Sequence, residues 1–232
     1  MKIFYNMAEA PEINIIDYKE LDLENIYFSH PKKVKGGSYI SEAYYKSDSN
    51  SNENVPIFIQ TPKLVNTTGI VKNDSRSYTE LELDQSHYPF FKFVTDLDDH
   101  NIVNIQKNSL TWFNKHFPID VVEEFYKTPI KIGKNKSPPK LRLKIPVSKN
   151  SITCNIYDQS KNIIDFTNVK KSNKVICVLE FVGLRFLKQQ VLCEWNPVQI
   201  KLCDTIKTTP QKYLINEDLL TDDEKPSVES SV

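Results

Sequence analysis

Residues 139–146, with the sequence PKLRLKIP, alternate basic and apolar side chains. Because successive side chains of a β-strand point to opposite faces, this pattern predicts a strand with one core-packed face and one cationic face. Like charges on the cationic face would lie about 7 Å apart, close to the repeat of a stretched nucleic-acid backbone. The residues predicted to form this face are Lys140, Arg142 and Lys144.

The sequence around this strand contains no acid that would neutralise it. Residues 125–157 include eight bases and no Asp or Glu. A solvated strand face is the alternative interpretation of a lone basic triplet, and the surrounding bases weigh against it. The loop before the strand adds Lys131, Lys134 and Lys136 to the predicted binding surface.

Aromatic side chains supply the second ingredient of single-strand binding, because nucleobases of any sequence stack on ring faces. The chain contains 11 Tyr, 12 Phe and 2 Trp, and most of the Phe residues are expected in the core. Tyr and Trp close to bases are the better candidates, both at a basic turn over residues 30–37 and in the later strands. The remaining predicted nucleic-acid-binding residues are Lys32, Lys33, Lys35, Tyr39, Tyr44, Tyr45, Tyr157, Arg185, Lys188 and Trp195.

Charge is unevenly distributed along the chain. Its 232 residues contain 30 Lys plus Arg and 30 Asp plus Glu, so the net charge is zero. Residues 216–232 hold six acids and one base, which leaves residues 1–215 with 29 bases, 24 acids and a net charge of +5. A flexible acidic segment can occupy a basic groove in competition with nucleic acid; a solubility tail is the alternative interpretation. We predict a disordered acidic tail over residues 205–232 that competes for the groove.

No residue pattern supports catalysis or the binding of a cofactor. The sequence KIGKNKS at residues 131–137 lacks the upstream glycine of a phosphate-binding loop. The four cysteines and four histidines lack the paired spacing of a zinc site. Cysteines in apolar, strand-like runs are typical of core residues in a reducing compartment. We predict a protein that is not an enzyme and has neither a cofactor nor a metal.

Secretion and membrane insertion are not expected. Residues 1–16 lack the apolar core of a signal peptide. No apolar run approaches the roughly 18 residues that cross a membrane. We therefore expect no membrane partner.

Periodicity predicts a mainly β (α+β) chain with one helical block. Helical spacing is expected over about residues 88–127, in two pieces broken near residues 98–101 and a short third helix at residues 119–126. Gly183, inside a long strand pattern, predicts a β-bulge or a sharp bend. Strands are expected at residues 37–46, 55–62, 78–83, 141–147, 152–158, 163–166, 174–186 and 191–202.

Long antiparallel strands interrupted by a helical block favour an OB-like antiparallel β-barrel with extra strands and a helical insertion. We expect an N-terminal extension at residues 1–36. The barrel domain is expected at residues 37–204, with the insertion at about residues 88–127. The acidic tail follows at residues 205–232.

Four segments carry a resemblance to a known family: IFIQTPKL at residues 57–64, WFNKHFPIDVVEEFYKTPIK at 112–131, PPKLRLKIPVS at 138–148 and VICVLEFVGLRFLKQQVLCEW at 175–195. Together they resemble a family of proteins encoded by nucleocytoplasmic large DNA viruses, over residues 27–202. The order of elements is also similar to that of the single-stranded-DNA-binding OB-fold protein of African swine fever virus. The resemblance implies a virus that replicates its DNA in the host cytoplasm. It also implies that the strand with Lys140, Arg142 and Lys144 is the wall of a DNA-binding groove.

These observations predict a single-stranded DNA-binding protein that coats unwound DNA in viral replication, recombination or repair. Lys and Arg would neutralise phosphates, and Tyr and Trp would stack bases. The expected partners are single-stranded DNA or RNA, and viral replication proteins reached through the acidic tail. The expected location is the viral factory of the host cytoplasm, with packaging in the virion as a further expectation. The alternatives are a structural or minor virion protein acting as an assembly module, and an RNA-binding transcription accessory factor.

Overall fold

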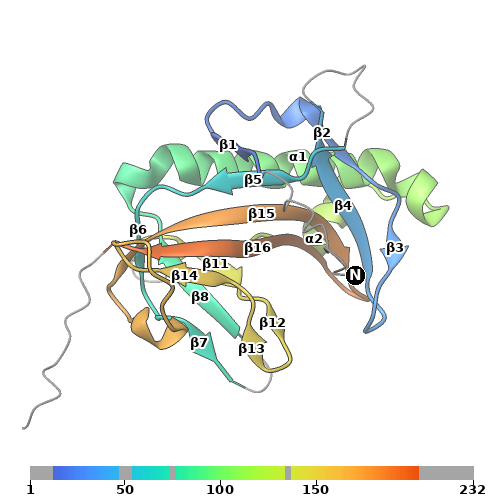
Figure 1. Cartoon of the computed structure of the whole chain (residues 1–232). Coiled ribbons are helices and arrows are strands. Elements are labelled where there is room, and N and C mark those ends of the chain that lie inside the picture. Colours follow the sequence, from blue (N-terminus) through green and yellow to red (C-terminus); the bar gives the residue numbers. More distant parts are fainter. Residues whose placement is uncertain (1–12, 47–53, 74–76, 134–136, 204–232) are drawn as a thin grey trace, which may run out of the picture.

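The computed structural model describes residues 13–46, 54–73, 77–133 and 137–203, and its fold is mainly β with two helices (Figure 1). Lys134, Lys136 and the predicted acidic tail lie outside the described residues. The helices are α1 (Tyr88–Phe113) and α2 (Ile119–Phe125). The strands are β1 (Ile15–Ile16), β2 (Ile26–Phe28), β3 (Lys32–Lys33), β4 (Tyr39–Tyr45), β5 (Ile57–Gln60), β6 (Leu64–Asn66), β7 (Val71–Lys72), β8 (Ser77–Glu82), β9 (Tyr126–Lys127), β10 (Ile130–Lys131), β11 (Lys140–Lys144), β12 (Val147–Ser148), β13 (Ser151–Ile152), β14 (Asn155–Tyr157), β15 (Lys174–Phe186) and β16 (Val191–Leu202).

The long hairpin of β15 and β16 forms the centre of the sheet. These two strands are antiparallel, with pairs running from Val175 and Leu202 to Phe186 and Val191. Along its other edge β15 pairs in turn with β6, β5 and β4. The other edge of β16 pairs in parallel with β9 near its start and with β14 near its end. Most of the sheet is therefore joined through one strand, β15.

A β-bulge at Gly183 changes which side chains of β15 face the core. The register with β16 shifts between Phe181 and Gly183, where the φ angle of Gly183 is 128°. Before the shift the odd-numbered side chains are buried, and after it Leu184 and Phe186 are buried. The predicted bulge is confirmed. It keeps apolar side chains of both halves in the core and leaves Arg185 on the opposite face.

The sheet curls into a partly open barrel. From β15 it continues through β6, β8 and β11 to β10, and β11 returns to contact β16. Among the described residues no backbone ladder joins β11 to β16, so a seam remains between these two strands. The predicted mainly β, OB-like class with extra strands and a helical insertion is confirmed. The sheet is mixed instead of wholly antiparallel, because β1–β5, β14–β16 and β9–β16 are parallel pairs, and the barrel is open at the seam.

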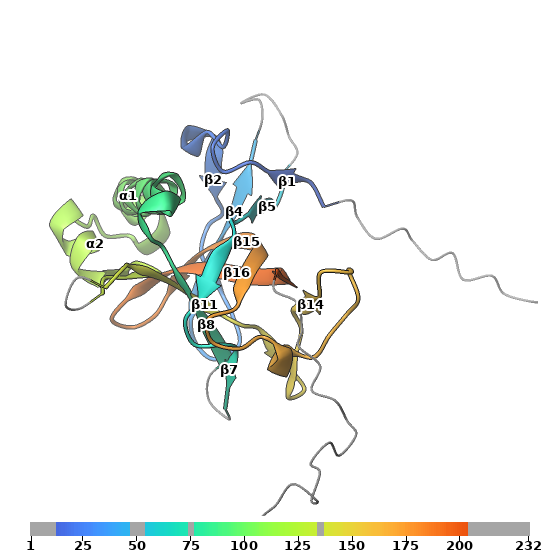
Figure 2. The same ribbon diagram turned by 90° about the vertical axis from the view of Figure 1, so that its left-hand side faces the viewer.

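Helix α1 packs along the sheet as one continuous element. Figure 1 shows it beside β5 and β15, and Figure 2 shows α1 and α2 on the side of the sheet away from β14. The predicted break near residues 98–101 is wrong, because Asp98 and Asn101 point inward and are buried. The buried residues of α1 follow helical spacing: Phe90, Phe93, Val94, Leu97, Asp98, Asn101, Ile105, Ser109 and Trp112.

Short elements differ most from the sequence predictions. Residues 163–166 do not form a strand; they contribute an isolated bridge between Tyr157 and Ile163 and the start of a 3-10 turn at Phe166. Residues 13–36 contribute β1, β2 and β3, and their Leu21 and Ile26 belong to the same core as the later strands. Each of these strands spans two or three residues, too few to show an alternating pattern.

The cysteines behave as core residues, as predicted for most of them. Cys154, Cys177 and Cys193 are buried, and Cys203 is half-buried. Burial raises the pKa of Cys154 to about 12, so this thiol stays protonated near neutral pH. No helix in the described part of the chain is long and apolar enough to cross a membrane. The described residues also include no group of three or more His, Cys, Asp or Glu side chains arranged to hold a metal ion.

A buried polar network ties α1 to the sheet. The Tyr126 hydroxyl donates to Asp98 Oδ1 at 2.6 Å, and the Thr128 hydroxyl donates to Asp98 Oδ2 at 2.5 Å. Asn101 donates from Nδ2 to the Tyr126 oxygen at 2.9 Å. Burial is the largest influence on Asp98 and raises its pKa from 3.8 to about 6, although both hydroxyl bonds act in the opposite direction. Asp98, which anchors α1 to the sheet, therefore makes the packing of α1 sensitive to pH.

We expect Gly183→Ala to lower the free energy of unfolding by about 2–4 kcal/mol. A Cβ at position 183 would lie 2.1 Å from the Ser41 carbonyl oxygen, and the positive φ angle disfavours any side chain. The measurement is urea unfolding followed by circular dichroism. Gly36→Ala is the matched control, because Gly36 has a φ of 93° but a Cβ there would meet no atom within 4 Å. Equal losses for the two variants would contradict the steric explanation.

Asp98 should make stability fall as pH rises from about 4 to about 6. Its pKa is higher in the folded protein than its ordinary value of 3.8, so proton binding favours the folded state. The contribution is complete below about pH 4, is lost through about pH 6 and amounts to about 3 kcal/mol. Urea unfolding at a series of pH values should show this slope in the wild type. It should disappear in Asp98→Asn and persist in Asp99→Asn, whose side chain is exposed; a slope retained in Asp98→Asn would contradict the assignment.

Candidate nucleic-acid interface

A groove of about 1510 Å³ lies at the seam of the barrel. One wall comes from β11 and the preceding segment of β9 and β10, and the other from the end of β15 and the first half of β16. Residues 193–198 of β16 lie between its pairings with β9 and β14 and have no further described strand on that edge. The groove therefore occupies the place where the sheet leaves β11 and β16 unpaired. We call it the basic groove.

Side chains with positive charge dominate the lining of the basic groove. Among the described residues, six bases from five strands line it, against a single acid, Glu194. Three aromatic residues lie among them. The bases are Lys72, Lys127, Lys131, Arg142, Lys144 and Arg185, and the aromatic residues are Tyr78, Phe166 and Trp195. This arrangement combines the charge and ring surface that single-stranded nucleic acids require.

The alternation predicted for β11 is confirmed. Leu141 and Leu143 are buried, Arg142 is half-buried and Lys144 is exposed. The neighbouring strands fix this orientation, because β11 lies between β8 and β10 in antiparallel register. Of the predicted cationic face, Arg142 and Lys144 line the basic groove, whereas Lys140 lies outside its lining.

Arg142 is held by two residues of β8. Its guanidinium carbon lies 4.0 Å from the centre of the Tyr78 ring, and its Nε lies 3.3 Å from Glu80 Oε1. Tyr78 and Glu80 are two residues apart on one strand, so their side chains share one face of the sheet with Arg142. Because the carboxylate contacts Nε, the terminal nitrogens of the guanidinium are left for other partners.

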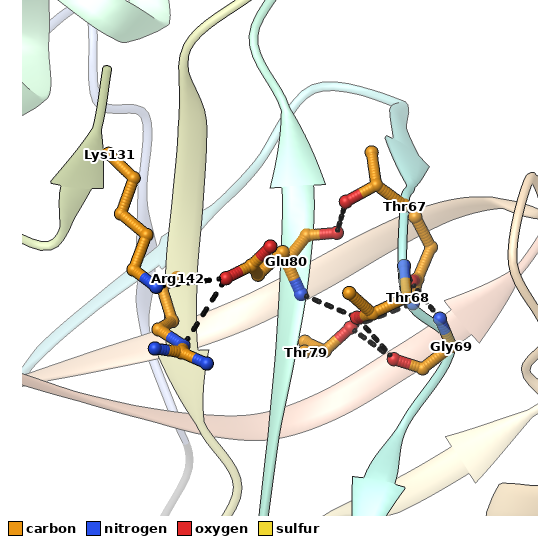
Figure 3. A network of polar contacts seen from close by, with 8 residues as sticks. Thr67, Thr68, Gly69, Thr79, Glu80, Lys131 and Arg142 are labelled. Carbon is orange, nitrogen blue, oxygen red and sulfur yellow. Dashed lines mark hydrogen bonds and ion pairs between the residues drawn. The ribbon is translucent and has the colours of Figure 1, made fainter. Parts of the chain in front are cut away.

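Glu80 also contacts Lys131, which overturns the expectation that no acid neutralises this basic segment. Lys131 Nζ lies 3.1 Å from the same Oε1 atom that faces Arg142. The side chain of Glu80 is 14% exposed, against 47% for Lys131 and 35% for Arg142. Glu80 is therefore less exposed than the two bases, and Figure 3 shows its carboxylate pointing toward both of them. The sequence around β11 lacks an acid, but the neighbouring strand supplies one.

The backbone around Glu80 is fixed by the turn after β6. The Glu80 N–H donates to the Thr68 hydroxyl at 3.2 Å, and its carbonyl accepts from the Thr67 N–H at 2.8 Å. The Thr79 hydroxyl donates to the Gly69 carbonyl at 3.0 Å (Figure 3). These bonds hold the strand that places the carboxylate.

The opposite wall repeats the pairing of a base with an acid. Arg185 donates from Nε to Glu194 Oε2 at 2.6 Å and from a terminal nitrogen to the Ser38 hydroxyl at 3.0 Å. Arg185 reaches this wall because the Gly183 bulge places it opposite the core. Both groove arginines are thus bound through Nε by a carboxylate.

The structure brings together some of the predicted binding residues. Lys131, Arg142, Lys144, Arg185 and Trp195 line the basic groove. Lys32 and Lys33 lie on β3, where Lys32 Nζ is 3.9 Å from Glu42 Oε2. Lys32, Lys33, Lys35, Tyr39, Tyr44, Tyr45, Lys140, Tyr157 and Lys188 do not line the basic groove.

Trp195 does not present a ring face for stacking. It is 5% exposed, and its ring packs on Phe181 with 5.0 Å between centroids. Its place on the core face of β16 follows from the alternation of that strand, in which Cys193 is buried on the same side. The stacking role expected for Trp195 is not supported by this position.

Two predicted tyrosines belong to a separate surface. Tyr44 stacks on Tyr27 with 6.0 Å between ring centroids and 15° between ring planes. Lys46 Nζ lies over both rings, at 5.2 Å from Tyr27 and 5.7 Å from Tyr44. Tyr45 is half-buried against the core. Their rings contact one another and the core, outside the lining of the basic groove.

Sequence reasoning did not find four of the nine basic and aromatic residues that line the basic groove. Lys127 was counted in the basic segment but was not predicted as a binding residue, and Lys72, Tyr78 and Phe166 come from other segments. A partial signal existed for Tyr78, because the alternation in residues 78–83 places it on the same face as Glu80. No such signal existed for Phe166, because its 3-10 turn lies near Lys72 only in the folded chain. The distance from Lys72 Nζ to the centre of the Phe166 ring is 5.7 Å.

Comparison with solved structures finds distant similarity to a phage protein. The single-stranded DNA-binding protein from bacteriophage Enc34 is 12% identical, with a TM-score of 0.44 over 83% of this chain and 97% of the phage chain. Its structure in complex with ssDNA is 13% identical, with a TM-score of 0.43 over 80% of this chain and 98% of the phage chain. Neither a shared fold nor a shared activity follows from similarity at this level.

Comparison of sequences gives a firmer assignment. The chain matches no curated protein. Residues 70–217 match the model of a family of unknown function, DUF5871. That match spans more than half of the chain and includes β8, both helices, β11 and the β15–β16 hairpin. The chain therefore belongs to the family of unknown function DUF5871.

Proposed function

We propose that this protein binds single-stranded DNA in the basic groove, without reading its sequence. The observation that carries the proposal is the groove itself, in which six bases and one acid of the described chain line a channel with aromatic residues among them. Backbone phosphates would be neutralised by Lys and Arg with release of counterions. Unpaired nucleobases would contact the half-buried rings of Tyr78 and Phe166.

The cellular role we propose is the coating of unwound DNA in the replication, recombination or repair of a large DNA virus, in the host cytoplasm. Its support is the resemblance of four sequence segments to proteins of such viruses, together with the groove. Viral replication proteins are the proposed partners of the acidic tail. RNA in place of DNA is an outcome that the binding test below distinguishes.

Binding of a dT oligonucleotide should weaken steeply with salt and depend on the groove lysines. Lys72→Gln/Lys144→Gln removes two groove charges, which should weaken binding about 10-fold at low salt and reduce the slope of log Kd against log salt by about 1.4. Fluorescence anisotropy at several salt concentrations measures both quantities. Duplex DNA should bind poorly because its bases are already stacked, and an equimolar RNA competitor shows whether DNA is preferred.

The matched control for this test is Lys107→Gln/Lys115→Gln, which removes the same charge. Lys107 lies on α1 and Lys115 follows it, and neither lines the basic groove. At about 0.1 M salt this variant should bind within about 2-fold of the wild type, since exposed charges beyond the Debye length of about 10 Å at that salt are largely screened. Equal losses in the two variants, or no binding of the wild type at low salt, would refute the groove as a DNA site.

Deletion of residues 216–232 should strengthen binding of the same oligonucleotide at low salt. The segment holds six acids and one base, and these acids would compete with phosphates for the groove. We expect a gain that vanishes at high salt, measured by anisotropy. A full-length variant with the six acids changed to Asn or Gln should reproduce it. Unchanged or weaker binding in both variants would disprove competition by the tail.

A further inference from the structure

Glu80 is the only described carboxylate within ion-pair distance of Lys131 or Arg142. One oxygen, Oε1, faces both bases, at 3.1 Å from Lys131 Nζ and 3.3 Å from Arg142 Nε. Glu80 itself is not part of the groove lining. It therefore places a negative charge directly behind two of the six groove cations.

We propose that Glu80 is an internal counter-charge that limits the affinity of the basic groove for a phosphate backbone. This inference rests on the proposed DNA binding and names the residue that sets its strength. Any phosphate that approaches Lys131 and Arg142 must share them with the carboxylate, and the carboxylate also repels the phosphate. The effect is electrostatic, so salt screens it.

The backbone of Glu80 is hydrogen-bonded to the turn after β6, which keeps the residue beside Lys131 and Arg142. Its N–H donates to Thr68 and its carbonyl accepts from Thr67, so the backbone is held on the side away from the groove. Its side chain is 14% exposed and is covered by the bases it contacts. The counter-charge is therefore carried by a residue of the folded strand β8.

Lys144 provides an internal comparison. It lines the same groove from the same strand as Arg142, is exposed, and has no carboxylate within ion-pair distance among the described residues. A phosphate at Lys144 gains the full attraction of the ammonium group, whereas a phosphate at Lys131 gains only the part that Glu80 leaves.

The test is Glu80→Gln, measured by anisotropy with a dT oligonucleotide. Gln has the same shape and still offers an oxygen to Arg142, but it lacks the charge. We expect binding about 4- to 10-fold tighter at low salt, with the difference shrinking below about 2-fold near 0.5 M salt. The matched control is Glu82→Gln, which removes the same charge two residues along β8 from a side chain that contacts neither base. Its binding should change by less than about 2-fold.

The outcomes separate this inference from the proposed function. Wild-type protein that fails to bind at low salt overturns both. Wild-type binding with Glu80→Gln equal to or weaker than wild type, or with Glu82→Gln equally tight, overturns the role of Glu80 alone. Thermal unfolding checks that the variants fold. If Glu80→Gln does not fold, the affinities of Lys131→Gln and Lys144→Gln for the oligonucleotide are compared. A smaller loss of affinity in Lys131→Gln than in Lys144→Gln supports the inference, and an equal or larger loss overturns it.

Discussion

At position 183 the backbone of β15 approaches β4 so closely that no side chain fits between them. A Cβ there would lie 2.1 Å from the Ser41 carbonyl oxygen and 2.8 Å from the Ala43 nitrogen. At the bulge that glycine permits, β15 changes from pairing with β5 to pairing with β4, while it stays paired with β16 on its other edge. The bulge also reverses the alternation of the strand, so that Leu184 and Phe186 are buried while Arg185 faces the groove. The packing of the core and the position of Arg185 in the groove therefore both depend on glycine at position 183.

Long periodic elements could be predicted from the sequence, because their patterns repeat several times within one segment. The β15–β16 hairpin, the basic strand β11 and the helical block were found in this way. The prediction of two separate helical pieces was wrong. Asp98 and Asn101 are polar residues that suggested a break in the helix, but both side chains are hydrogen-bonded to Tyr126 inside the core. Strands of two or three residues leave no pattern to read.

Part of the site was beyond sequence reasoning for a different reason. The alternating sequence of β11 predicted which of its side chains face away from the core. It did not predict that β8 is the neighbouring strand, and Glu80 faces Arg142 only because of the register between β8 and β11. Counting charges along residues 125–157 therefore overestimated the free charge. The exposure of Trp195 likewise depends on which face of β16 carries it. Sequence alternation does not fix that face for the whole strand, because the alternation of β16 changes at the register shift opposite Val178 and Leu179.

If the basic groove binds a DNA strand as proposed, the seam between β11 and β16 would determine how that strand enters. A closed ring of strands would have to be threaded from one end, whereas a groove that is open along its length admits a long molecule sideways. Such a ligand needs no free terminus, so an internal stretch of a polymer can be occupied as readily as its end. Under the proposed function, successive copies of the protein would be able to join or leave anywhere along a DNA strand without sliding past their neighbours.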